Sequence, residues 1–136
     1  MVETALVIFT LLVMTMGLIQ YGLVYNAVLS LNNLSREGAR YAAVRAQDIG
    51  DTPSGRAELT RQVTNYLLAR AKGTAVEPRS FTTASLRVEA PVLRSNSPVR
   101  VVIRYNMIAN KAFVPNLLPL PANYANYEAS AVNLIE

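Results

Sequence analysis

The first quarter of the chain is a run of hydrophobic positions that is almost free of charge. Residues 1–34 contain a single charged side chain, Glu3, and residues 4–25 contain none. About 20 apolar residues are enough for a helix to cross the hydrocarbon core of a bilayer. A helix also satisfies the backbone hydrogen bonds that lipid cannot make. The pattern therefore predicts a helix that is inserted in a membrane or later buried among copies of itself.

The helical pattern continues beyond this run. Residues 26–48 contain no proline, and apolar or small positions, including Gly38 and Ala42, recur three or four residues apart. A helix from about residue 2 to 48 would be roughly 70 Å long, so about half of it must project from a small domain. Gly38 and Ala42 belong to a set of small residues that would let another backbone approach closely. Alternatively, these residues are good helix formers beside an ordinary core.

The rest of the chain predicts a small head. Thr52 followed by Pro53 is typical of a helix start, and Gly73 of a helix end, which predicts a second helix over about 53–72. Apolar and polar positions alternate over 86–90 and 99–107, and residues 124–135 are a third candidate strand. We therefore expect an α+β fold: a long N-terminal helix with an apolar first half, a second helix and a three-stranded antiparallel sheet. Residues 1–48 would form the membrane or filament core, and residues 49–136 an α+β surface head.

Composition excludes several function classes. The chain has no Cys and no His, which excludes thiolate and imidazole metal sites and nucleophiles activated by His. The few acids are scattered, so we expect no catalytic, metal or cofactor-binding residues, no cofactor and no enzyme. All 13 basic residues follow Leu34, but they are spread along the chain and do not indicate nucleic acid binding. No base precedes the apolar run, which fits a chain whose short basic leader has already been removed rather than one with a secretory signal.

Three segments of the N-terminal third are distinctive: VETALV at residues 2–7, GLIQYG at residues 17–22 and SREGARYAA at residues 35–43. Together they resemble the TadE-like pilin family, in the tight-adherence branch of type IV pili. The resemblance covers roughly residues 2–46. It implies a prepilin that is held in the inner membrane, cut by a prepilin peptidase and extracted by the pilus assembly machinery into a filament at the cell surface.

The resemblance implies a structural subunit that forms a homo-oligomeric helical filament, a Tad pilus, through its N-terminal helix. The alternative is a single-pass membrane-anchored accessory protein, either a minor pilin or a component of an envelope machine, that does not polymerise. The apolar helix suits both functions, whereas a stripe of small residues is needed only by the first.

Glu3 is the leading candidate for a residue that sets the register of such a filament. A lone carboxylate in an apolar helix is costly to bury without a partner. In a filament it would meet the amino terminus, at Met1, of a neighbouring subunit. Alternatively, Glu3 lies at the level of the lipid headgroups and interacts favourably with the positive end of the helix dipole.

Other candidates for assembly contacts come from the helix and from a proline-containing loop. Gly17 and Gly22 would soften the helix or allow close packing, and Gln20 would hydrogen-bond to a neighbouring helix or within its own. The apolar loop at 113–120 would make a second contact between subunits or cover an edge of the protein's own sheet. The predicted assembly residues are Met1, Glu3, Gly17, Gln20, Gly22, Gly38, Ala42, Phe113 and Leu117.

Overall fold

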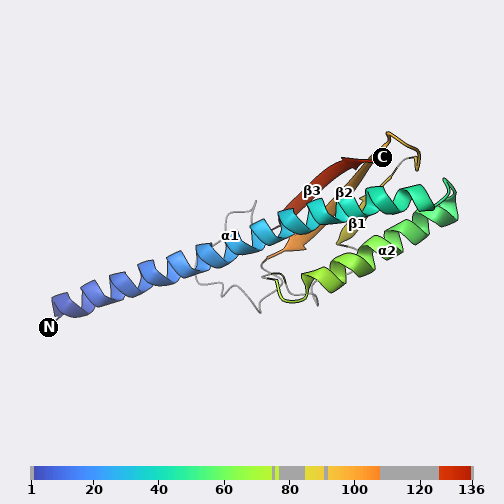
Figure 1. Ribbon diagram of the computed structural model, residues 1–136. Helices are drawn as coiled ribbons and strands as arrows, with labels where there is room; N and C mark the ends of the chain where they lie inside the picture. Colours follow the sequence, from blue (N-terminus) through green and yellow to red (C-terminus); the bar gives the residue numbers. More distant parts are fainter. Residues whose placement is uncertain (1, 75, 77–84, 91, 108–125, 136) are drawn as a thin grey trace.

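One helix runs through the whole molecule. The computed structural model describes residues 2–74, 76, 85–90, 92–107 and 126–135, and its longest element is α1, Val2–Asp48. The amino-terminal half of α1 projects away from every other element, whereas its second half lies beside α2 and the strands (Figure 1). The structure thus confirms the predicted continuous helix and its projecting half. Gly17 and Gly22 do not interrupt it.

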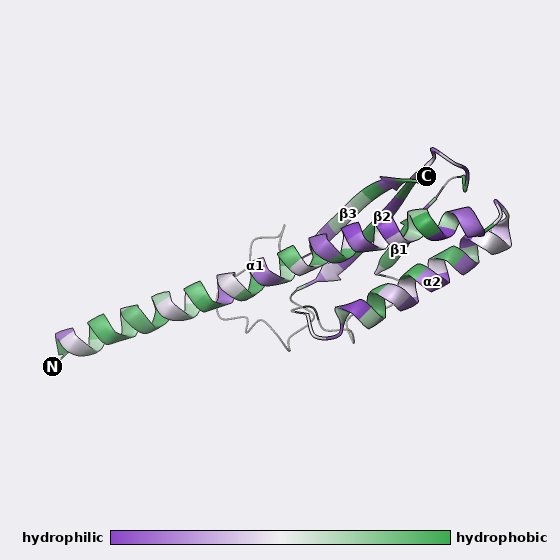
Figure 2. Ribbon diagram, viewed as in Figure 1, coloured by the Kyte–Doolittle hydropathy of each residue, from purple (hydrophilic) through white to green (hydrophobic). Residues whose placement is uncertain are grey.

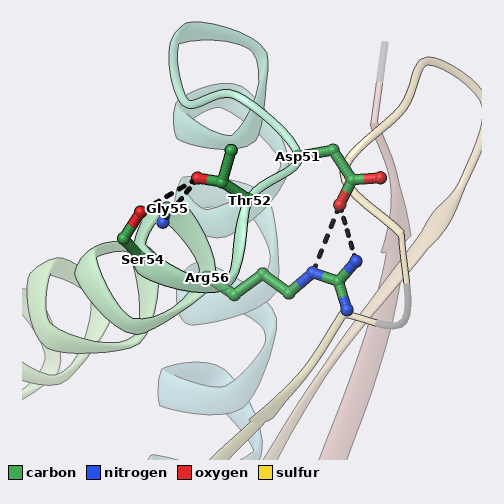
Figure 3. Close-up of polar contacts among 5 residues, drawn as sticks. All are labelled: Asp51, Thr52, Ser54, Gly55 and Arg56. Atoms are coloured by element: carbon green, nitrogen blue, oxygen red, sulfur yellow. Dashed lines mark hydrogen bonds and ion pairs between the residues drawn. The ribbon is translucent and has the colours of Figure 1, made fainter.

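Local chemistry sets both ends of α2, Pro53–Ala71. Thr52 has an extended backbone, and its Oγ1 accepts a hydrogen bond of 3.0 Å from the Gly55 N–H, while Pro53 occupies the start of the first turn (Figure 3). At the other end Gly73 has a φ of +85°, the left-handed conformation that closes many helices. The structure confirms the predicted helix to within one residue at its end.

Arginine–carboxylate pairs lie along the exposed side of the first turns of α2. Arg56 donates hydrogen bonds of 3.2 and 2.7 Å to Asp51 Oδ1 (Figure 3), and this contact holds the pKa of Asp51 below its usual value. Arg61 donates to both oxygens of Glu58 and, with a smaller contribution from Gln62, lowers the pKa of Glu58 from 4.5 to about 2. Solvent screens such exposed pairs, so they contribute little to stability.

The sheet has three antiparallel strands, as the sequence predicts, and their order is β1-β2-β3. Its strands are β1, Leu86–Glu89; β2, Pro98–Asn106; and β3, Asn126–Leu134. Val88 pairs with Val101 and Ile103 pairs with Ala129, so side chains of the same face stand side by side across the sheet. The odd-numbered residues of β2 are buried and most of the even-numbered ones are exposed, which is the alternation seen in the sequence.

The core lies between this sheet and the two helices, and α1 supplies much of it. The second half of α1 packs against β3 and β2 on one side and α2 on the other. The Tyr41 ring of α1 also lies parallel to the Tyr66 ring of α2, with 4.3 Å between ring centres. One helix therefore serves as both the projecting segment and the spine of the head. The core includes Val24, Ala27, Leu31, Leu34, Ala42 and Ala46 of α1, Leu59, Val63 and Leu67 of α2, and Val99, Val101, Ile103 and Ala129 of the sheet.

Candidate assembly surface

The main candidate for a functional surface is the projecting part of α1. We call residues 2–16 the rod, because every side chain in this range is exposed. The rod is mostly hydrophobic, apart from Glu3 and three threonines, and Figure 2 shows it as an almost continuous apolar stretch. Phe9 is 67% exposed and Met14 is 65% exposed. The other exposed large apolar side chains of the rod are Val2, Leu6, Val7, Ile8, Leu11, Leu12, Val13 and Met16.

The rod lies within the segment of α1 that is long and apolar enough to cross a membrane. Within the described residues, α1 is the one helix that meets this criterion of length and composition. In its most apolar stretch of 18 residues, 6% is buried. Thr10 and Thr15 donate their hydroxyl groups to the carbonyls of Leu6 and Leu11, so the polar groups of the rod are partly satisfied within the helix. Such a surface fits lipid or other apolar helices far better than water.

Glu3 stands in the first turn of this rod. Its carboxylate is exposed, and its place at the amino end of α1 is favourable because the helix dipole is positive there. Among the described residues, no hydrogen bond or ion pair reaches Glu3. Met1, the predicted source of a partner amino group, lies outside the described residues.

The other predicted contacts in the first half of α1 lie just beyond the rod and occupy different environments. Gly17 and Gln20 are buried, and Gln20 has an interaction within the chain. Gly22 is exposed, and a Cβ atom added there would meet no atom of the described residues within 4 Å. Gly22 therefore leaves room for a close approach from outside, whereas Gly17 and Gln20 are already covered within the chain.

Gly38 and Ala42 are buried inside the protein's own head. A Cβ atom added at Gly38 would lie 3.0 Å from Leu67 Cδ1, so the missing side chain makes room for α2. Ala42 is 0% exposed and belongs to the same core. Packing within the chain, the alternative expectation from the sequence, accounts for both small residues. Phe113 and Leu117, the remaining candidates, lie outside the described residues.

A second exposed surface lies on the head half of α1. We call it the α1 ridge; it consists of Asn33, Arg36, Arg40, Val44 and Gln47, which recur every three or four residues and all face solvent. A groove of about 370 Å³ between α1 and α2 flanks one side of the ridge, and another lies between α1 and β3 on its other side. Arg36 and Arg40 lie within the SREGARYAA segment quoted above, but the sequence did not single them out as assembly residues.

The charges of the head are unevenly paired. Each acid of the described head residues has a basic partner, as in Glu37–Arg70 and Glu128–Arg104, both at 2.9 Å. By contrast, Arg36 and Arg40 of the ridge have no hydrogen bond or ion pair with any described residue. The remaining acid–base pairs are Asp48–Arg45, Asp51–Arg56, Glu58–Arg61 and Glu89–Arg87.

The described residues can also be compared with the requirements of a metal site and of a substrate pocket. Over the described ranges, no three Asp or Glu residues converge in a way that could hold a metal ion. The grooves between α1 and residues 66–74 are open to solvent, unlike the enclosed pockets that usually hold substrates. The exposed faces of α1 are therefore the main candidates for function in the described part of the chain.

Residues 1–40 match the family described as TadE-like protein. This match confirms the resemblance stated from the sequence, over the rod and the first part of the head half of α1. The TadE-like family is pilus-related, and its members are structural or accessory proteins rather than enzymes. Residues 1–40 are therefore similar to a pilus-related family, and α1 is compatible with membrane anchoring. Neither the curated proteins nor the solved structures that were compared include a match to the chain.

Proposed function

We propose that this protein is a pilin subunit that polymerises into an extracellular Tad pilus through α1. The observation that carries the proposal is the rod, a helix segment whose apolar side chains have no cover within the described chain. Fully burying one Val, Leu, Ile, Phe or Met side chain is worth about 1.5–3 kcal/mol. Summed over the rod, the free energy gained by even partial burial of these side chains is comparable to the net stability of an ordinary domain, about 5–15 kcal/mol.

Two environments can cover such a rod. Before assembly it would lie in the inner membrane, because lipid tails are as apolar as its side chains. In a filament, the rods of neighbouring copies would replace the lipid and form a dry central bundle. The heads would then face water, consistent with the ion-paired outer face of the sheet. Such a subunit would depend on a prepilin peptidase and on the pilus assembly machinery.

The assembly residues of this proposal lie in the rod and near its base. Glu3 would take a counter-charge from a neighbouring subunit, and Gly22 would admit a neighbouring helix because no described residue occupies the space beside it. Gly17 and Gln20 would pack within the subunit rather than against a neighbour, since both are buried. Gly38 and Ala42 are assigned to the core of the head instead.

The experiment is electron microscopy of material sheared from cells that express the protein, with mass spectrometry to identify the chain in purified filaments. A matched pair of variants makes the result specific. Leu11→Arg would place a charge in the rod and should abolish filaments, whereas Arg100→Gln on the outer face of the sheet should leave them unchanged. If sheared filaments lack this chain, or if Leu11→Arg forms them normally, polymerisation through the rod is wrong.

The alternative function is a membrane-anchored accessory protein that remains in the envelope. The rod would then stay in lipid, and the head would contact other proteins through its exposed surface. That function predicts that the chain fractionates with membranes and is missing from sheared filaments, so the same fractions distinguish the two proposals.

A further inference from the structure

Along α1, complementary charges without an ion-pair partner among the described residues lie at two distant places. Glu3 is the one acid there without a basic partner, and it lies near the tip of the rod. Arg36 and Arg40 are exposed on the α1 ridge without an acidic partner. Both places lie on the same helix, separated by more than 30 residues, so one chain cannot bring them together while α1 is straight.

The arrangement of Arg36 and Arg40 indicates that they face an external anion. The two residues are four apart on a helix, where like charges stand side by side and repel. Glu37, the acid that lies between them in the sequence, already accepts a hydrogen bond of 2.9 Å from Arg70. A carboxylate between two guanidinium groups would remove the repulsion and gain charge-assisted hydrogen bonds.

We propose that Arg36 and Arg40 of one copy bind the Glu3 carboxylate of a second copy, so that the tip of each rod docks on the α1 ridge of a neighbour. This inference rests on the proposed polymerisation and names the contact that would set its axial register. It gives Glu3 a counter-charge from the head of another subunit, rather than from that subunit's amino terminus.

The geometry of two parallel α1 helices permits this contact. Placing Glu3 of one copy level with residues 36–40 of the other requires an axial offset of roughly 50 Å, at 1.5 Å per residue. In that register Val7, on the same face of the rod as Glu3, lies near Val44 at the next turn of the ridge. Both valines are 56% exposed in the single chain, so this surface is available for the contact.

Cysteine cross-linking tests the contact directly, because the native chain contains no Cys. We expect full-length protein with Val7→Cys and Val44→Cys to form a disulfide-linked ladder in isolated filaments under oxidising conditions. The matched control pairs Val7→Cys with Val132→Cys, which is 60% exposed on the outer face of the sheet and should give no ladder. Filaments without the Val7–Val44 ladder would overturn the contact but leave polymerisation standing, whereas the absence of filaments from the native protein would overturn both.

A charge exchange tests the partner of Glu3. Glu3→Arg alone should lower the number of filaments about tenfold or more, because it places three like charges at one contact. Adding Arg36→Glu and Arg40→Glu to that variant should restore filaments to within about twofold of the native number. If the amino terminus is the true partner of Glu3, the triple variant stays without filaments and the proposal fails.

A control variant with the same loss of charge elsewhere on the head separates this contact from a general effect of net charge. The double variant Lys72→Gln and Arg100→Gln also removes two positive charges from the head, but neither residue lies on the α1 ridge. We expect its filament number to match that of the native protein, whereas Arg36→Gln with Arg40→Gln should reduce it. Equal losses in both double variants would show that total charge matters and would overturn the proposal.

Discussion

Gly22 and Gly38 lie on the same helix, yet a methyl group added at each would meet opposite surroundings. At Gly22 it would meet no atom of the described residues within 4 Å, whereas at Gly38 it would press against the side chain of Leu67. The sequence predicted that small residues allow a close approach at both positions. It could not tell whether the approaching surface belongs to the same chain or to another one, because periodicity identifies a helix face but not its occupant.

The first prediction concerns these two glycines. Gly38→Val should lower the free energy of unfolding by about 1–3 kcal/mol, because a larger side chain in a filled core forces its neighbours to shift. Gly22→Ala should leave it unchanged or raise it by up to about 1 kcal/mol, since Ala is the better helix former. Urea unfolding in detergent, followed by far-UV circular dichroism, measures both. Equal destabilisation by the two substitutions would contradict the assignment of Gly38 to the core.

At the scale of elements, the sequence signals were strongest where local chemistry alone decides the structure. The helical pattern without proline over residues 26–48 predicted that the apolar helix continues to about residue 48, and the alternation along β2 predicted a strand with one buried face. The α1 ridge was not predicted, because its residues became distinctive only when the structure showed which side of α1 the sheet and α2 cover. The loop at 113–120 lies outside the described residues, so its two proposed roles stay predictions.

The second prediction concerns the start of α2. Thr52→Ala removes the oxygen that accepts the Gly55 N–H and should lower the free energy of unfolding by about 1 kcal/mol. Thr52→Ser keeps that oxygen and should stay close to the native value. Thermal unfolding of the two variants under one buffer condition measures the difference. If Thr52→Ala unfolds at the native temperature, the cap does not contribute to the stability of the head.

At the scale of the whole molecule, the second half of α1 packs together with the head. The sequence divided the chain into a helix, residues 1–48, and a head, residues 49–136. In the structure the core of the head includes Leu31, Leu34 and Ala42, so the second half of α1 packs as part of the head. Sequence periodicity predicted the stripe on α1 but could not show that the stripe closes the protein's own core.

The third prediction follows from this arrangement. A fragment of residues 23–136 lacks the rod and should fold as a monomer in water without detergent. A fragment of residues 49–136 should not fold, because it exposes the sheet face and the α2 face that α1 covers. Size-exclusion chromatography and a cooperative thermal transition measure the outcome. A folded 49–136 fragment would show that the head does not need α1.

The continuity of α1 also has a mechanical consequence. No flexible linker separates the rod from the head, because one helix without a break belongs to both. A pull on the head is therefore transmitted along hydrogen bonds parallel to the helix axis, and it loads the contact between α1 and the sheet in shear. A subunit built in this way passes tension along its backbone and cannot swivel about its own anchor.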